Sequence, residues 1–310
     1  MSDQTRLPPI QRWIEHLAHP ALLVGAYLLW QAMGRGGDAL LVTLTLALGV
    51  LMLLEHLVPA RPDWRLRMAQ RVQLAGLYLM SFVLFGVLTS VHEAWLVAPL
   101  ATTREALRLG WPSTLPIVAQ VLLLFFASDF LYYWVHRAIH RWGWFWKASG
   151  HGFHHAFQNL HTLNVGTNHP FEIVLLTLPM VLVAAVFGAG ADAVAGASVL
   201  IVVNTAAAHA NVRMETPGLN WLITSANQHR RHHSNEFEVS NTNFACNAIL
   251  WDRLFGTYSS GDVAQTGIGP GEPTLWQKFL LPFREPDFAD TAASRARRPR
   301  GGYSSGSSDR

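Results

Sequence analysis

The sequence predicts an all-α, polytopic membrane protein with about four transmembrane helices, a re-entrant or short helix pair, and a cytoplasmic helical cap that carries a histidine-rich di-metal site. Three observations predict this class. Half of the 310 residues are hydrophobic and only 14% are charged, which is unusual for a soluble domain of this size. Long apolar segments alternate with short polar connections. Eleven of the fifteen histidines lie between His136 and His233.

The first half of the chain contains four apolar segments, at about residues 20–33, 39–57, 74–91 and 115–135. A helix needs about 20 apolar residues to cross the ~30 Å hydrocarbon core, so the first segment requires flanking residues to complete a span. A later apolar stretch, residues 171–208, is interrupted by Gly188, Gly190 and Asp192. Its length suits two short helices that enter the bilayer and return, or a kinked pair lying in it.

Arginines set the predicted orientation. A short connection after the second segment carries Arg61, Arg65, Arg67 and Arg71, and the other short loops show no comparable excess of positive charge. Because short loops rich in Lys and Arg remain in the cytoplasm, we expect this loop and the N-terminus inside. The chain then divides into an N-terminal cytoplasmic segment (1–19), transmembrane helices (20–135), a catalytic region (136–285) and a disordered tail (286–310).

The overall charge and the cysteine content exclude several classes of function. The formal charge is +3, but the basic residues are scattered rather than gathered in one stripe, so nucleic-acid binding is not expected. The single cysteine, Cys246, excludes an intrachain disulfide framework, a thiolate zinc site and a four-cysteine iron–sulfur cluster. A redox metal would therefore need other ligands.

Three histidine clusters supply them. His136 and His140 are four residues apart at the end of the fourth apolar segment, which places both imidazoles on one helix face. Two further clusters read His-x-x-His-His, and they comprise His151, His154 and His155, then His229, His232 and His233. In a helix, the first and last members of this pattern share a face, while the middle one points about 100° away and can reach a neighbouring ion.

The number of ligands indicates two ions. A zinc site uses three or four protein ligands, so eight clustered histidines are too many for one zinc. Imidazole suits iron, copper, nickel and zinc alike, and ligand chemistry alone does not choose among them. No Asp or Glu lies between His136 and Pro170, which excludes the Glu-x-x-His pattern of ferritin-like di-iron bundles for this stretch.

These residues resemble the fatty acid hydroxylase superfamily of membrane enzymes, which includes sterol desaturases, sphingolipid hydroxylases and alkylglycerol monooxygenase. The resemblance covers residues 55–258, about two thirds of the chain. It is carried by Asp129-Phe-Leu-Tyr-Tyr-Trp-Val-His136-Arg-Ala-Ile-His140, His151-Gly-Phe-His154-His155, Asn168-His169-Pro170, His209-Ala-Asn211, His229-Arg-Arg-His232-His233-Ser234 and Trp251-Asp252-Arg253-Leu254-Phe255-Gly256-Thr257.

The resemblance implies an oxygenase with two iron ions and O2 as co-substrate. It implies that the three histidine clusters and His209 are both ligands and catalytic residues, with His169 as a further metal ligand. Asp129 lies two helical turns before His136 and could accept a hydrogen bond from a metal-binding imidazole. Asp252 resembles the aspartate of the family's closing motif and is expected to brace the site in the same way.

The expected activity is O2-dependent hydroxylation or desaturation of a membrane lipid: a sterol, fatty acyl, sphingoid or ether lipid. Electrons are expected from a separate ferredoxin, or from a cytochrome b5-type donor with its reductase, because the sequence contains no flavin fingerprint and no cysteine cluster. Two alternatives remain: a membrane acyl desaturase of the related three-histidine-box group, and a non-enzymatic, histidine-rich metal transporter. Transporter ligands are expected at mid-membrane, whereas these clusters fall just beyond helix ends.

Overall fold

The computed structural model describes residues 9–286, and within this range the chain is helical without strands, which confirms the predicted class. The predicted tail lies outside the described residues except for Pro286. Six long helices form the body: α1 (Pro9–Ala32), α2 (Gly37–Leu57), α3 (Met68–Ala106), α4 (Ile117–Arg141), α7 (Pro170–Phe187) and α8 (Ala191–His209). The short helices are α5 (Gly143–Ser149), α6 (Gly152–His155), α9 (Ala226–His232), α10 (Phe237–Ser240), α11 (Leu250–Leu254), α12 (Leu275–Phe279), η1 (Pro62–Trp64), η2 (Thr162–Gly166) and η3 (Leu219–Trp221).

Five of the long helices, α2, α3, α4, α7 and α8, are long and apolar enough to cross a membrane. The apolar stretch after residue 170 is two separate helices of 18 and 19 residues, each long enough to span. Gly188 ends α7 in the left-handed conformation (φ 75°), which glycine adopts without steric cost. Large apolar side chains such as Leu46 and Val87, both 54% exposed, cover the outside of the bundle, as a lipid-facing surface requires.

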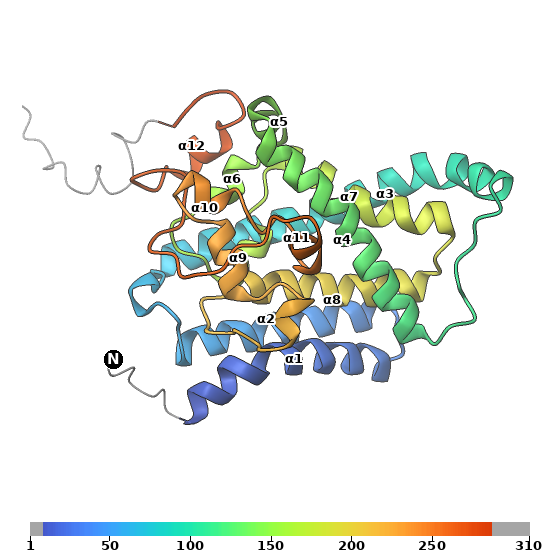
Figure 1. Cartoon of the computed structure of the whole chain (residues 1–310), viewed down its shortest axis with the longest axis horizontal. Helices are drawn as coiled ribbons and strands as arrows, with labels where there is room; N and C mark the ends of the chain where they lie inside the picture. The colour runs from blue at the N-terminus through green and yellow to red at the C-terminus, as the bar shows by residue number, and fades with distance from the viewer. Residues whose placement is uncertain (1–8, 287–310) are drawn as a thin grey trace, which may run out of the picture.

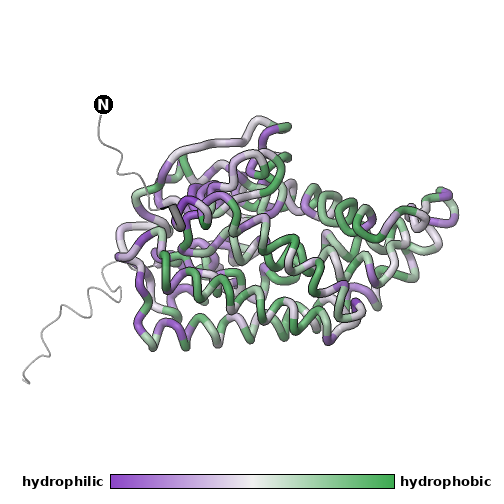
Figure 2. Tube along the Cα trace, turned by 90° about the horizontal axis from the view of Figure 1, so that it is seen from below, coloured by the Kyte–Doolittle hydropathy of each residue, from purple (hydrophilic) through white to green (hydrophobic). Residues whose placement is uncertain are grey.

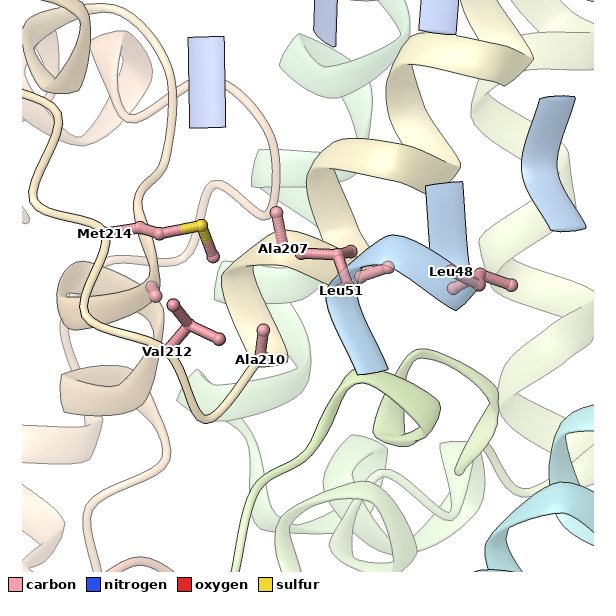
Figure 3. Packing of buried hydrophobic residues seen from close by; sticks show 8 residues of the cluster. Leu48, Leu51, Ala207, Ala210, Val212 and Met214 are labelled. Atoms are coloured by element: carbon pink, nitrogen blue, oxygen red, sulfur yellow. The ribbon is translucent and has the colours of Figure 1, made fainter. Parts of the chain in front are cut away.

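Helix α8 lies at the centre of the bundle and packs on α1, α2, α4 and α9. Small residues permit this. A Cβ atom at Gly196 would lie 2.4 Å from Val121 Cγ2 and 2.9 Å from the Trp30 ring, so only glycine fits there. Near the other end of α8, Leu48 and Leu51 of α2 pack against Ala207 and the chain that follows it (Figure 3). Contacts of this kind fix where His209, the last residue of α8, is placed.

The short helices and the loops between them form a cap at one end of the long helices (Figure 1). Hydrophilic residues gather at that end of the molecule, while the long helices are mainly hydrophobic (Figure 2). The basic loop after α2 belongs to this end as well, because the guanidinium of Arg61 donates to the carbonyl oxygen of Ala264 at 3.2 Å. The cap and the arginine-rich loop therefore lie on the same side of the bundle.

Candidate metal centre

The structure brings nine of the predicted histidines together where the long helices meet the cap. They come from the end of α4, from the segment around α6, from the last residue of α8, and from α9 with the residue after it. Gly150 shapes the approach to α6. It adopts φ 72°, and a Cβ atom there would lie 2.6 Å from the His169 ring. All nine imidazoles are buried except that of His140, which is partly buried.

These nine side chains form two groups, in each of which the candidate ligand atoms lie within 4.8 Å of one another. Group one comprises His136, His140, His151, His155 and His232. Group two comprises His154, His209, His229 and His233. Each His-x-x-His-His cluster contributes to both groups, two imidazoles to one and the third to the other, so the two groups are interleaved and adjacent. The rings of His155 and His233 stack across the boundary with centroids 4.3 Å apart.

Within each group the Nε2 atoms face one another. In group one, Nε2 of His151 lies 2.9 Å from Nε2 of His136 and 3.0 Å from Nε2 of His140. In group two, the corresponding separations are 3.0 Å for His229–His209 and 3.1 Å for His233–His229. Two nitrogens bound to one ion at ~2.1 Å and at right angles are ~3.0 Å apart, so these separations fit a shared metal ion.

The hydrogen bonds of Nδ1, the other ring nitrogen, show that the inward-facing Nε2 atoms carry a lone pair and no proton. Nδ1 of His136 donates to the carbonyl oxygen of Phe244 (2.6 Å), Nδ1 of His154 to that of Thr167 (3.1 Å), and Nδ1 of His209 to that of Thr205 (2.7 Å). A carbonyl oxygen can only accept, so Nδ1 carries the proton and Nε2 of the neutral ring does not. Inward-facing lone pairs at such short range repel one another, and a bound cation removes that repulsion.

Burial favours the neutral rings further. For the histidines of the cap, burial and the charge of neighbouring imidazoles hold the pKa well below the ordinary value of 6.5, as for His151, His154, His155, His229, His232 and His233. The apolar surroundings disfavour an imidazolium, and each additional positive charge in the group opposes the next. At neutral pH these nitrogens are therefore available as metal ligands.

Glu172 is a functional candidate that the sequence analysis missed. Its Oε1 accepts a hydrogen bond from Nδ1 of His151 at 2.6 Å, and both side chains are buried. The imidazoles of His136, His154, His209 and His232 instead donate to backbone carbonyls. The available signal was a lone carboxylate in the first turn of an otherwise apolar helix, two residues after Pro170.

Comparison with known proteins places this arrangement in a family. Residues 121–257, which contain all nine clustered histidines, match the fatty acid hydroxylase family model. This part of the chain is a fatty acid hydroxylase domain.

The relatives of this hydroxylase domain act on different lipids according to their names. Over 231 residues, the chain is 26% identical to ornithine lipid hydroxylase OlsE of Rhizobium tropici, covering 70% of this chain and 68% of that protein. It is 30% identical over 156 residues to very-long-chain aldehyde decarbonylase GL1-11 of Oryza sativa subsp. japonica, covering 48% and 58%. It is 30% identical over 148 residues to methylsterol monooxygenase 2-2 of Arabidopsis thaliana, covering 47% and 54%.

The chain thus spans between about half and two thirds of these relatives' lengths. No solved structure matches it.

In this hydroxylase domain, the two predicted aspartates support the centre through the backbone rather than through an imidazole. The carboxylate of Asp129 accepts hydrogen bonds from the N–H groups of Asn247 (3.0 Å) and Ala248 (2.8 Å). That of Asp252 accepts from the N–H groups of Phe244 (2.7 Å) and Ala245 (2.8 Å). Direct aspartate–histidine bonds were expected, but both carboxylates instead accept backbone N–H groups of loop 244–248.

His169 lies outside both groups of the domain. Its Nδ1 accepts the backbone N–H of Phe171 at 3.2 Å and so caps the start of α7. Its ring packs against Phe153, Phe171 and Phe279. The structure therefore places this residue at a helix cap, away from the inward-facing Nε2 atoms.

A cavity of about 1430 Å³ connects the domain's histidines to the interior of the bundle. It is lined mainly by apolar side chains of α3, α4, α7 and α8, and His154 and His209 of group two line its cap end. The opposite end is bordered by Arg104 and Gly188. The volume exceeds the ~300–1,000 Å³ of ordinary small-molecule sites and suits a lipid.

Proposed function

We propose that this chain is an integral membrane di-iron oxygenase that uses O2 and external electrons to oxidise a lipid. The observation that carries this proposal is that His154 and His209 of group two line one end of a large apolar cavity inside the bundle, with group one directly beside group two. Ligands for two ions and a space for hydrocarbon meet at the same place. The match to fatty acid hydroxylases supports the reaction class.

The two groups would hold the two ions. His136, His140, His151, His155 and His232 would bind the first, and His154, His209, His229 and His233 the second. Bound iron would supply the reductive activation of O2 that oxidation of an unactivated C–H bond requires. His169 is not included, because its Nδ1 is engaged in the α7 cap.

The residues of the chain fix the geometry and exclude water. Carbonyl oxygens and Glu172 orient the imidazoles through Nδ1, and the buried aspartates hold loop 244–248, which supplies the Phe244 carbonyl. The apolar walls of the cavity hold a hydrocarbon chain beside the metal groups and keep bulk solvent away from them. Binding and orientation are therefore the protein's share of catalysis.

We propose hydroxylation rather than desaturation as the main reaction, since two of the relatives named above are a hydroxylase and a monooxygenase. A membrane acyl desaturase is the second candidate, supported by the same large apolar cavity. The metal transporter is less well supported, because the histidines lie at the cap end of the helices rather than along a path through them.

We further propose that the cap faces the cytoplasm, because the arginine-rich loop after α2 lies on its side and such loops stay inside. Electrons would come from a separate ferredoxin, or from a cytochrome b5-type donor with its reductase. Turnover of the purified protein with NAD(P)H alone would contradict the need for a separate electron donor.

Metal analysis of the purified, full-length protein is the first test. We expect two iron ions per chain in the wild type, loss of iron in His232→Ala, and retention in His161→Ala, which removes a buried histidine outside both groups whose Nε2 bonds to the Trp64 carbonyl. One zinc ion per chain would refute the proposal.

Lipid mass spectrometry of cells with and without the gene, under ¹⁸O2, then tests the reaction. Lipids that gain one ¹⁸O atom only when the gene is present support hydroxylation, and lipids that only lose two hydrogens support the desaturase.

A further inference from the structure

Several polar groups line the histidine end of the cavity, and Tyr132 is one of them. It lies on α4, one helical turn before His136, and the two rings are 5.1 Å apart. Asp129 and Cys246 line the same end. Tyr132 is partly buried, and it faces the cavity rather than the outside of the bundle.

The hydroxyl group of Tyr132 makes no hydrogen bond with any residue that the structure describes. Other polar side chains at this end are occupied by the protein: Asp129 accepts two backbone N–H groups, and the hydroxyl of Thr205 donates to Asn247. The neighbouring Tyr133 has its hydroxyl at 2.9 Å from Thr257 Oγ1 and 3.1 Å from the Arg137 guanidinium. The contrast between two adjacent tyrosines shows that Tyr132 is the one left available.

A phenolic hydroxyl inside an apolar cavity needs a partner. Leaving such a group without a hydrogen bond costs ~1–3 kcal/mol, so buried tyrosine hydroxyls are normally paired. No residue that the structure describes supplies this partner to Tyr132, so it comes from the contents of the cavity, either water or a bound ligand. The surrounding wall is apolar, and a lipid with one polar end supplies both the hydrocarbon and the hydrogen-bonding group.

The opposite end offers a competing anchor, Arg104, whose guanidinium is held in part by the end of α7. One of its guanidinium nitrogens donates to the carbonyl oxygen of Ala185 at 3.1 Å, and a Cβ atom at Gly188 would lie 3.0 Å from the same nitrogen. Arg104 is therefore engaged at the end of α7. From Ala191 to His209, α8 extends the cavity wall by ~27 Å at 1.5 Å per residue, long enough for an extended acyl chain.

We infer that Tyr132 binds the polar end of an amphiphilic long-chain lipid through its hydroxyl, so that the chain runs along α8 toward Gly188 and oxidation falls on a carbon near the polar end. The part of this inference that concerns the oxidised carbon rests on the proposed function, whereas the binding of the polar end by Tyr132 does not. It assigns Tyr132 as a substrate-positioning residue beside group one. The alternative orientation, with the polar end at Arg104, would present the methyl end of the chain to the histidines.

A binding experiment on the metal-free, full-length protein in lipid nanodiscs separates this inference from the oxygenase proposal. The probes are 1-octadecanol and octadecane, which share a chain and differ in the polar end, and each displaces a fluorescent fatty acid. We expect Tyr132→Phe to weaken octadecanol binding by about 2- to 12-fold, as for one hydrogen bond, and to leave octadecane binding unchanged.

Tyr27→Phe is the matched control, because it removes a buried tyrosine hydroxyl in α1 that is outside the cavity lining. It should change neither affinity. Equal affinity of wild type and Tyr132→Phe for octadecanol would overturn the inference. In active preparations, product mass spectrometry gives the second readout. Oxidation near the polar end supports the orientation, and oxidation at the methyl end refutes it.

Discussion

Replacing Glu172 tests how the protein holds the centre of group one. Nε2 of His151 lies within 3.0 Å of Nε2 of both His136 and His140, so His151 occupies the middle of the group. Its orientation depends on a single buried bond of 2.6 Å from Nδ1 to Glu172. Glu172→Ala removes this acceptor, and Glu172→Gln keeps an oxygen but removes the charge.

The expected magnitude follows from that bond. Partners that orient a metal-binding histidine typically contribute about 10- to 100-fold in metal affinity, equal to about 1.4–2.8 kcal/mol. Because His154 and His209 of group two have Nδ1 acceptors that do not involve Glu172, we expect the loss to fall on one of the two ions. Glu172→Gln should lie near the lower bound, since the amide oxygen still accepts, and Glu172→Ala near the upper one.

The assay is iron retained per chain by the purified protein during titration with a chelator. Glu55→Gln is the matched control: a partly buried glutamate of the cap side, which accepts backbone N–H groups of Thr162 and Asn211 and belongs to neither group. It should keep both ions at wild-type affinity. If Glu172→Ala also retains two ions at wild-type affinity, the carboxylate does not orient His151 as argued here.

Three further predictions concern stability. Asp252→Asn should lower the free energy of unfolding by about 1–3 kcal/mol in a denaturant titration, because it weakens buried bonds to the N–H groups of loop 244–248; a change below ~0.5 kcal/mol would contradict this. Gly196→Val should lower Tm by overpacking against Val121, at a cost of about 1–3 kcal/mol, and an unchanged Tm would show that α8 can shift. The pKa of His154 and of His229 is lower in the folded protein than the ordinary 6.5, so the unfolded chain binds more protons. Metal-free protein should therefore lose stability as pH falls below about 6.5, measured as Tm against pH, and a Tm that rises on acidification would refute the sign.

The sequence was most informative where periodicity alone decides the outcome. The apolar segments at about 39–57, 74–91 and 115–135 predicted the candidate spanning helices α2, α3 and α4, because a bilayer leaves few other solutions for the backbone. The segment at about 20–33 lies in α1, which is not among the candidate spans of the described residues. The spacing of each His-x-x-His-His cluster predicted one imidazole turned away from the other two. The structure places His154 in group two, while His151 and His155 lie in group one. Likewise, it places His232 in group one, while His229 and His233 lie in group two.

Hydrogen bonds between residues far apart in the sequence could not be predicted from periodicity or spacing. Asp129 was given the right helix face by its spacing from His136, but its actual partners are N–H groups of residues 247 and 248, more than a hundred positions away. A carboxylate can satisfy an imidazole or two adjacent backbone donors, and only the path of loop 244–248 determines which. The sequence also could not show that the hydroxyl of Tyr132 lacks a protein partner, since no pattern distinguishes it from the bonded hydroxyl of Tyr133.

The start of α7 shows how one short string serves the metal centre without entering either histidine group. Pro170 occupies the first helical position, where a missing N–H costs nothing, and His169 caps the helix by accepting the N–H of Phe171. These two residues set the direction in which α7 leaves the cap. Glu172, within the first turn, is then carried to Nδ1 of His151 at 2.6 Å. The motif His-Pro-x-Glu therefore indicates a helix start that brings a carboxylate to the metal centre. The histidine of the motif can serve the centre as a helix cap, without binding metal.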